Sequence, residues 1–253
     1  MNNQREDSIK EFEAESDSIL RSLVLDQGFQ KHQKRITNFL EENSILCSEL
    51  INNNQSKTCL FILNKLYNIC VEILRSFPVE LDPKGAIRHF FTQLRLKEKT
   101  NKAFSASKPL NIPNLIFLIQ SYGSLKDIVE IKNTDHFQYY LITEFFLVTV
   151  NNLAQIQLKR NKPDLSKDYL LRAMECLSLL SYSSYYIKYH ITTVAINLIY
   201  LVEENFREES SQLLCNAALY LENLEKELDN HALSKNIYEY LNGKSNSFVL
   251  FVE

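Results

Sequence analysis

Glycine is scarce in this chain, and that scarcity limits the folds open to it. Only 4 of the 253 residues are glycine and 5 are proline, whereas 45% are apolar. A β-sandwich or a doubly wound sheet needs many tight turns, which depend on glycine and proline. Long helices joined by short links need few such turns. The composition therefore predicts an all-α protein.

Apolar residues also recur at helical spacing along almost the whole chain. In residues 6–50 this spacing predicts two amphipathic helices. The sequence KTCLFILNKLYNICVEILRSFP predicts a helix that is apolar on most faces and therefore central, with Ser56 as its N-cap and Pro78 at its end. A further helix follows, with Asp82 and Pro83 suited to its N-cap and first turn.

The stretch SASKPLNIPN, which contains two prolines, is the clearest break in the chain. After it, a short apolar segment is expected near residues 114–131. Five helices are expected to follow near residues 135–160, 165–181, 185–206, 208–229 and 232–242. Their links are so short that neighbouring helices must run antiparallel. We therefore predict a single bundle of about nine antiparallel helices over residues 1–243, followed by a C-terminal tail over residues 244–253.

A tetratricopeptide-like helical array is the alternative architecture. The stretch NNLAQIQLKRNKPDLSKDYLLRAMECL has the size of one helix hairpin of such an array, with the small residue Ala173 where helices pack closely. The period does not repeat cleanly elsewhere.

Charge and hydropathy exclude several classes of partner. The net charge is −3 and the lysines and arginines are scattered, so no basic stripe indicates nucleic-acid binding. The chain opens on a polar segment, and its apolar stretch YYLITEFFLVTV is interrupted by Glu144 and too short to cross a membrane. These features predict a cytoplasmic protein that binds neither nucleic acid nor membranes.

Motifs for enzyme chemistry and metal binding are missing. No phosphate loop, HExxH or GxSxG motif occurs, so no catalytic residue, metal or cofactor is expected. The cysteines lie in apolar runs without CxxC spacing and are predicted to be reduced core thiols: Cys47, Cys59, Cys70, Cys176 and Cys215. The histidines have no metal-ligand spacing and are predicted to be ordinary surface or capped residues: His32, His89, His136, His190 and His231.

Two aromatic runs, FQYYLITEFF and YSSYYIKYH, leave a further alternative open. They could line a pocket of an enzyme that lacks a known motif, although core packing is the default for aromatic residues at helical spacing.

The stretch AINLIYLVEENF places Asn197 and Glu204 seven positions apart, about two helical turns, among apolar neighbours. An amide and a carboxylate bury badly unless each finds a partner. Both side chains are therefore expected either to pair with other side chains or to bind a ligand.

This stretch and its continuation, FREESSQLLCNAALYLENLEKELD, resemble the C-terminal third of 14-3-3 proteins. In that family an Ala-Leu-Asn helix with a Tyr-Glu pair two turns on leads into a helix that ends in an acidic turn. The segment YLLRAMECLSLLS resembles the preceding helix, and the resemblance covers about 90 residues. It implies a bundle curved around a groove that binds an extended partner segment carrying phosphoserine or phosphothreonine. It also implies a homodimer through the amino-terminal helices, here residues 6–50.

The resemblance assigns a role to several residues. Asn197 matches the family asparagine that hydrogen-bonds the peptide backbone, and Glu204 matches an acidic residue along the same helix face. The segment LFILNKLYN resembles the helix with the phosphate-binding lysine, which places Lys65 there. The family arginine that follows is not kept: Glu72 falls near its position, and Arg75 is the nearest substitute.

The family's Arg-Tyr pair falls within VTVNNL, where the residues are Thr149, Val150, Asn151 and Asn152. A doubly charged phosphate needs fixed, charge-assisted donors, so its recognition is expected to be weakened, altered or lost. We therefore predict a non-catalytic adaptor that binds extended segments of partner proteins, phosphorylated or not. A tetratricopeptide-like scaffold is the alternative function.

The tail GKSNSFVLFVE is a further potential ligand of the same groove. Its apolar run is unfavourable in water, and tethering gives it a high local concentration. The hypothesis places Ser245 or Ser247 toward Lys65. Phe248 and Leu250 would then pack on the apolar wall near Ile196 and Tyr200. The alternative is a tail that packs on the outside or stays disordered.

Overall fold

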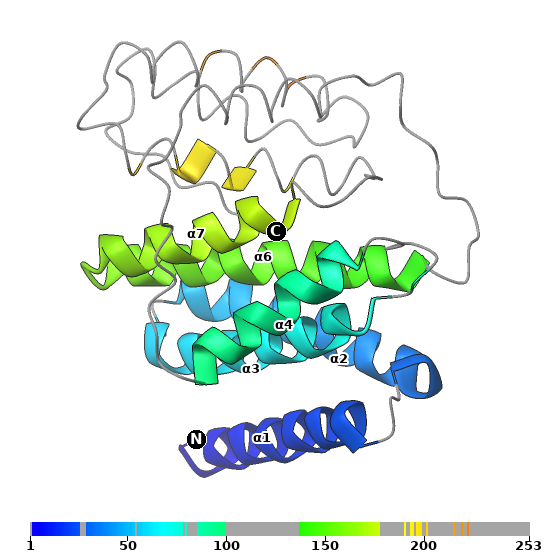
Figure 1. Ribbon diagram of the computed structural model, residues 1–253. Helices are drawn as coiled ribbons and strands as arrows, with labels where there is room; N and C mark the ends of the chain where they lie inside the picture. The colour runs from blue at the N-terminus through cyan, green and yellow to red at the C-terminus, as the bar shows by residue number, and fades with distance from the viewer. Residues whose placement is uncertain are drawn as a thin grey trace.

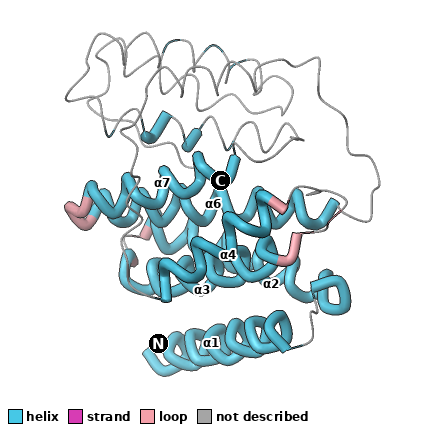
Figure 2. Tube along the Cα trace, in the orientation of Figure 1, coloured by secondary structure: helices cyan, strands magenta, loops and turns pink. Residues whose placement is uncertain are grey.

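Helices account for all the regular structure in the part of the chain that the structure describes. This computed structural model describes residues 2–25, 29–53, 55–77, 79, 85–99 and 137–177, together with residues 190, 193, 194, 196–198, 201, 215, 219 and 222. No strand occurs among them, so the all-α prediction is confirmed (Figure 2). The expected segment near 114–131, most of each helix expected beyond residue 181, the boundary at residue 243 and the tail lie outside these residues.

Six helices have described bounds, and they stack in layers. They are α1 (Asn2–Leu25), α2 (Phe29–Asn52), α3 (Ser56–Arg75), α4 (Ala86–Lys99), α6 (Phe137–Lys159) and α7 (Pro163–Leu177). In Figure 1, α1 lies on one side of α2, α3 and α4, and the hairpin of α6 and α7 lies on the other. Helix α3 contacts α1, α2, α4 and α6, which confirms the prediction that this apolar helix is central.

The starts of α3 and α4 differ from the predicted ones. The N-cap of α3 is Gln55, so the prediction of Ser56 was wrong. The Gln55 amide donates to the Leu50 carbonyl at 2.8 Å, and the Gln55 carbonyl accepts from the Cys59 amide at 3.1 Å, so the chain turns directly from α2 into α3. Helix α4 begins at Ala86, behind Gly85 with φ of 66°. Asp82, Pro83 and Pro78 lie outside the described residues.

The turn between α6 and α7 follows the local chemistry of its sequence. Asn161 adopts a positive φ of 55°, which asparagine tolerates better than most residues. Its amide donates to the Leu158 carbonyl at 2.9 Å, and the Lys162 amide donates to the Gln157 carbonyl at 2.9 Å. These two bonds form the Schellman motif that ends a helix, and Pro163 begins the next one. The predicted antiparallel hairpin is thereby confirmed at this link.

Aromatic side chains fill the space between α3, α4 and α6. The ring of Phe146 lies 5.3 Å from that of Phe91 and 5.7 Å from that of Tyr67. Tyr139 and Tyr140 of the same run both contact the ring of Phe77. Tyr139, Tyr140 and Phe146 all belong to the run FQYYLITEFF. They are buried, so they pack in the core.

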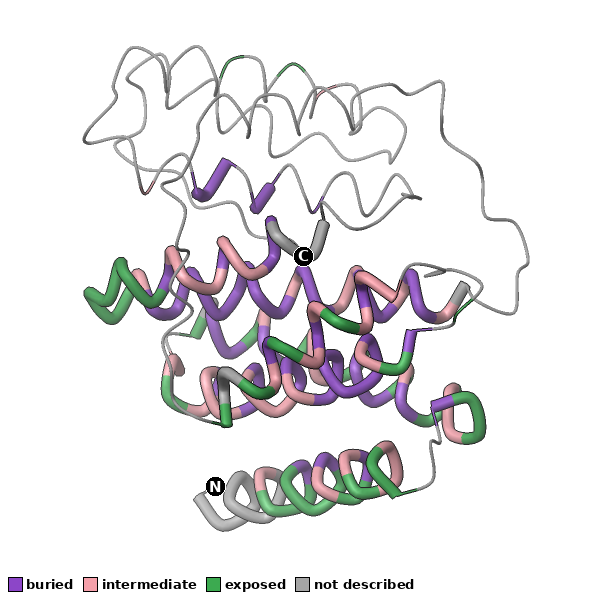
Figure 3. Tube along the Cα trace, viewed as in Figure 1, coloured by how far each residue is buried: buried purple, intermediate pink, exposed green. Residues whose placement is uncertain are grey.

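Helix α1 packs against its own protomer. Phe12 stacks on Phe39 of α2 at 5.4 Å and meets Phe61 of α3 edge-on at 6.2 Å. Ile19 is fully buried on the same face. The apolar face expected to bury either within a protomer or across two is therefore buried within one, and the opposite face of α1 is exposed (Figure 3).

The predictions for cysteine hold in part. Cys47, Cys59 and Cys70 are buried free thiols, as predicted. Cys215 is exposed, so its assignment to the core was wrong. Leu219, one helical turn further, is also exposed, and an apolar run alone does not reveal which of its faces is covered. No described helix has an apolar stretch of the length needed to cross a membrane.

His190 lies in the interior, so of the surface or capped positions expected for the histidines the surface one does not apply to it. Burial lowers its pKa to about 4. The unfolded chain therefore binds the proton more tightly, with a pKa near 6.5. The stability that depends on a neutral His190 is fully present above pH 6.5 and is lost as the pH falls toward 4. We expect His190 alone to destabilise the protein by roughly 2–3 kcal/mol at pH 4.5 relative to pH 7.

Urea unfolding of the wild type and of His190→Gln between pH 4.5 and 7 measures this effect. The variant should lose the part of the pH dependence that arises from His190, whereas His89→Gln at an exposed site of α4 should not. An unchanged pH dependence in His190→Gln would refute the assignment.

Candidate functional site

Lys65 lies on the face of α3 that meets α1. Its Nζ atom contacts Asp17 Oδ1 at 2.7 Å and lies 5.8 Å from the centre of the Phe61 ring. The hydrogen bond from Lys65 holds the pKa of Asp17 below its usual value. The lysine that the resemblance assigns to phosphate binding is thus engaged with a carboxylate of its own chain.

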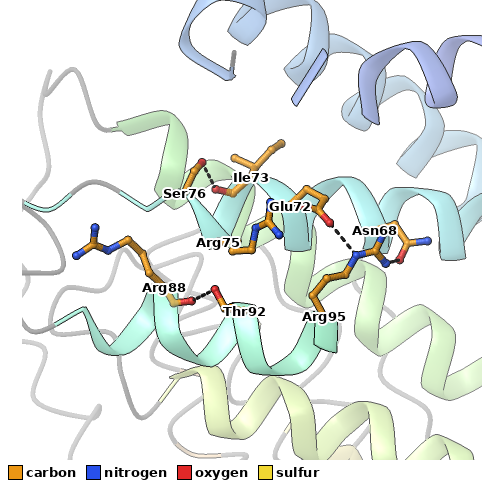
Figure 4. A network of polar contacts seen from close by, with 8 residues as sticks. All are labelled: Asn68, Glu72, Ile73, Arg75, Ser76, Arg88, Thr92 and Arg95. Atoms are coloured by element: carbon orange, nitrogen blue, oxygen red, sulfur yellow. Dashed lines mark hydrogen bonds and ion pairs between the residues drawn. The ribbon is translucent and has the colours of Figure 1, made fainter. Parts of the chain in front are cut away.

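Arg75 lies at the C-terminal end of α3, in an ion-pair cluster with α4 (Figure 4). One of its guanidinium nitrogens lies 2.9 Å from Glu72 Oε2, and Nε of Arg95 lies 2.7 Å from Glu72 Oε1. Arg95 also donates a hydrogen bond to Asn68 at 3.3 Å. The Glu72 side chain is 5% exposed, so two arginines compensate one buried carboxylate.

The α6 residues where the resemblance expects an Arg-Tyr pair are buried and neutral. Thr149, Val150, Asn151 and Asn152 are each at most 2% exposed, because α6 is covered on most faces (Figure 3). No guanidinium or phenol stands at these positions.

Asn197 pairs with one of these residues. Its Nδ2 donates a hydrogen bond to Asn151 Oδ1 at 2.6 Å, and Asn197 itself is 8% exposed. Asn197 was expected either to pair with another side chain or to bind a ligand, and the structure shows a side-chain partner. Ile196 is fully buried, which leaves no apolar surface of its own for a tail. Glu204 and Tyr200 lie outside the described residues.

The contacts thus divide the expected site into separate places. Lys65 binds across α1 and α3, Arg75 binds Glu72 beside α4, and Asn197 binds α6. No contact among the described residues joins any two of these three side chains.

A small pocket lies beside the Asn151–Asn197 pair, where residues of α6 and α7 meet Asn197 and Leu201. Its polar lining among the described residues is formed by Asn151, Gln155, Ser166 and Asn197. Its apolar lining is formed by Ala154, Leu158, Leu170 and Leu201. The cavity volume between these side chains is about 10 Å³, which is room for about one water molecule.

The sequence analysis missed Asp17, Arg95 and Gln155. Asp17 and Arg95 belong to ordinary charged helix faces, so nothing in the sequence separates them from solvated residues. Gln155 had a usable signal, because it follows Asn151 by one helical turn in the run NNLAQIQ, where four amides interrupt an apolar helix. Among the described residues, no group of three or more histidine, cysteine, aspartate or glutamate side chains is placed to hold a metal ion.

Searches against protein-family models, curated proteins and solved structures returned no match to this chain.

Proposed function

We propose that this chain is a non-catalytic, 14-3-3-like adaptor that binds an extended segment of a partner protein beside Asn197. The hydrogen-bonded pair of Asn151 and Asn197 at the wall of the pocket carries this proposal, because paired amides present fixed donors and acceptors to a peptide backbone. The resemblance over about 90 residues gives the same role to Asn197.

Recognition of the segment does not depend on phosphate in this proposal. Lys65 and Arg75 are already paired with Asp17 and Glu72, so a phosphate would have to displace a carboxylate from each. The buried Asn151 and Asn152 add no positive charge. A phosphoryl group held by so few unengaged cations would gain little over a hydroxyl.

A contact between α2 and α6 favours this reading over a tetratricopeptide-like scaffold. In an array each repeat touches only its neighbours, whereas α2 and α6 are far apart in the chain. The proposal also includes a cytoplasmic homodimer. Val24, Leu25 and Ile45 of α1 and α2 are 60%, 79% and 59% exposed, and they supply apolar surface for a second copy.

Paired peptide arrays test the function directly. We expect the full chain to bind some extended segments equally well in their serine and phosphoserine forms. Binding restricted to the phosphorylated member of each pair would contradict the proposal, and binding to no peptide of either kind would refute the adaptor function.

Asn197→Ala tests the residue that carries the proposal. The substitution removes donors for the peptide and also the hydrogen bond that Asn197 donates to the buried Asn151. We therefore expect peptide binding to weaken by about 1 kcal/mol or more and the free energy of unfolding to fall by about 1–3 kcal/mol. Fluorescence polarisation and urea unfolding measure the two effects.

Asn152→Ala is the matched control. Asn152 is a buried amide of the same α6 stretch. It is not among the residues that line the pocket, and its Oδ1 has no hydrogen-bond partner among the described residues. Its loss should leave peptide binding unchanged. If Asn197→Ala lowers stability but binds peptides as the wild type does, Asn197 is only a structural residue.

A further inference from the structure

The outer face of α2 separates its charges into a basic half and an acidic half. Asn38 stands at the middle of this face, and the positions three, four and seven residues to either side share it, because these spacings return to the same side of a helix. The three positions before Asn38 are basic, whereas those after it are two glutamates and one isoleucine. All residues of this face are exposed: Lys31, Lys34, Arg35, Asn38, Glu41, Glu42 and Ile45.

The order of these charges does not stabilise α2 itself. A helix on its own is stabilised by acidic residues in its first turn and basic residues in its last turn, which compensate the partial charges of its ends. Helix α2 has neither, since Lys31 lies in its first turn and Glu49 in its last. The charge order is therefore unfavourable within one chain, and a partner of complementary charge would explain it.

Most of these charges are available to a partner. No side-chain ion pair or hydrogen bond in the described part of the chain engages four of them: Lys31, Lys34, Glu41 and Glu42. Arg35 lies 3.4 Å from Glu15 of α1, but the two side chains are 48% and 46% exposed. Water screens a pair of this kind, so Arg35 can exchange it for another carboxylate at little cost.

A second copy of the chain offers the complementary surface. When two α2 helices pack antiparallel about a two-fold axis at Asn38, the basic half of each lies against the acidic half of the other. Lys34 of one copy then meets Glu41 of the other. Arg35 likewise meets Glu42, and both pairs occur twice because the interface is isologous. A parallel pairing would instead place like charges together.

The apolar residue of this face fits the same arrangement. Ile45 is 59% exposed and lies as far after Asn38 as Lys31 lies before it, so the two meet across the two-fold axis. The methylene groups of a lysine pack on apolar surface while its ammonium group stays in water. The exposed isoleucine is thereby covered without displacing any charge from solvent.

We propose that two copies of this chain associate through the outer face of α2, antiparallel and centred on Asn38. The inference rests on the proposed function, which includes a homodimer, and it defines the surface and the orientation of that dimer. Exposed ion pairs contribute little individually, so the dimer is weak and depends on ionic strength.

Charge reversal tests the pairing. Lys34→Glu with Arg35→Glu makes the centre of the face acidic in both copies, and Glu41→Lys with Glu42→Lys makes it basic. Each variant alone should be monomeric at concentrations at which the wild type dimerises, because like charges then meet across the axis. An equimolar mixture of the two variants should recover dimers, because every facing pair is again opposite in charge. Sedimentation velocity measures the mass of each species.

Arg160→Glu with Lys162→Glu is the matched control, since it reverses the same two residue types at exposed positions of the turn between α6 and α7. It should dimerise like the wild type. Salt at about 1 M, where charges are screened beyond about 3 Å, should weaken the wild-type dimer about tenfold or more. The mixture also excludes a folding defect, because two unfolded variants could not restore each other.

The outcomes separate this inference from the proposed function. Dimers that persist in either α2 variant alone, or a mixture that stays monomeric, would overturn the α2 interface and leave a homodimer through another surface. A wild type that is monomeric at every concentration would refute both the interface and the homodimer. Peptide arrays test the adaptor function separately, because none of the residues that line the pocket at Asn197 belongs to α2.

Discussion

Replacing Phe146 by alanine is expected to lower the free energy of unfolding by about 3–5 kcal/mol. Phe146 is fully buried on α6, and its ring contacts Phe91 of α4 and Tyr67 of α3 at centroid distances of 5.3 and 5.7 Å. The substitution removes the apolar group that joins three helices and leaves a cavity that the rigid neighbours fill only in part. Urea unfolding followed by circular dichroism measures the loss.

Phe145→Ala is the control for this prediction. Phe145 is the next residue of the same helix and is only partly buried against the core, so helix propensity and volume change alike in the two variants. Its substitution should destabilise the protein by less than half as much. Equal losses would show that α6 is not packed through Phe146 as described.

The sequence was most informative where local chemistry determines structure. Residues Ser56 to Arg75 are apolar on most faces, and such a helix can be stable only at the centre of a bundle, where α3 lies. The segment after α6 contains asparagine and then proline at the positions that a Schellman end and a helix start require. Both features depend on neighbours within a few residues.

The candidate site depended on partners distant in the sequence, which the sequence pattern cannot supply. Lys65 was assigned to a ligand, but Asp17 lies 48 residues earlier and meets it only because α1 packs on α3. Asn197 was correctly expected to need either a partner or a ligand, yet nothing in the sequence identified Asn151 as that partner. The N-cap of α3 was missed for a similar reason, since the preceding helix determines where the chain turns.

Glu72 shows most clearly how one substitution changes the meaning of its neighbours. In the resemblance to 14-3-3 proteins, Glu72 falls near the position of a phosphate-binding arginine, and Arg75 is the nearest substitute for that arginine. Here Glu72 is the buried acceptor of both Arg75 and Arg95. The arginines of this cluster therefore stabilise the contact between α3 and α4, and they are not displayed for an anion.

Arg95→Met is accordingly expected to destabilise the fold by about 3 kcal/mol, because removing one partner of a buried ion pair leaves the other charge poorly compensated. Glu72 is 5% exposed at its side chain and would keep only Arg75, which is itself 38% exposed. Arg75→Met is the matched control: it removes a more exposed guanidinium from the same carboxylate, and a loss of at most about 1 kcal/mol is expected.

The double variant Glu72→Met with Arg95→Met separates an unpaired charge from lost packing. Replacing both partners by apolar groups of similar length removes the uncompensated carboxylate, so the double variant should regain much of the stability that Arg95→Met loses. Thermal and urea unfolding of the four proteins of this cycle give the coupling between the two residues. If the double variant is less stable than Arg95→Met by the full effect of Glu72→Met alone, the two residues are not coupled. The contact between Glu72 and Arg95 would then add no stability beyond the separate effects of the two side chains.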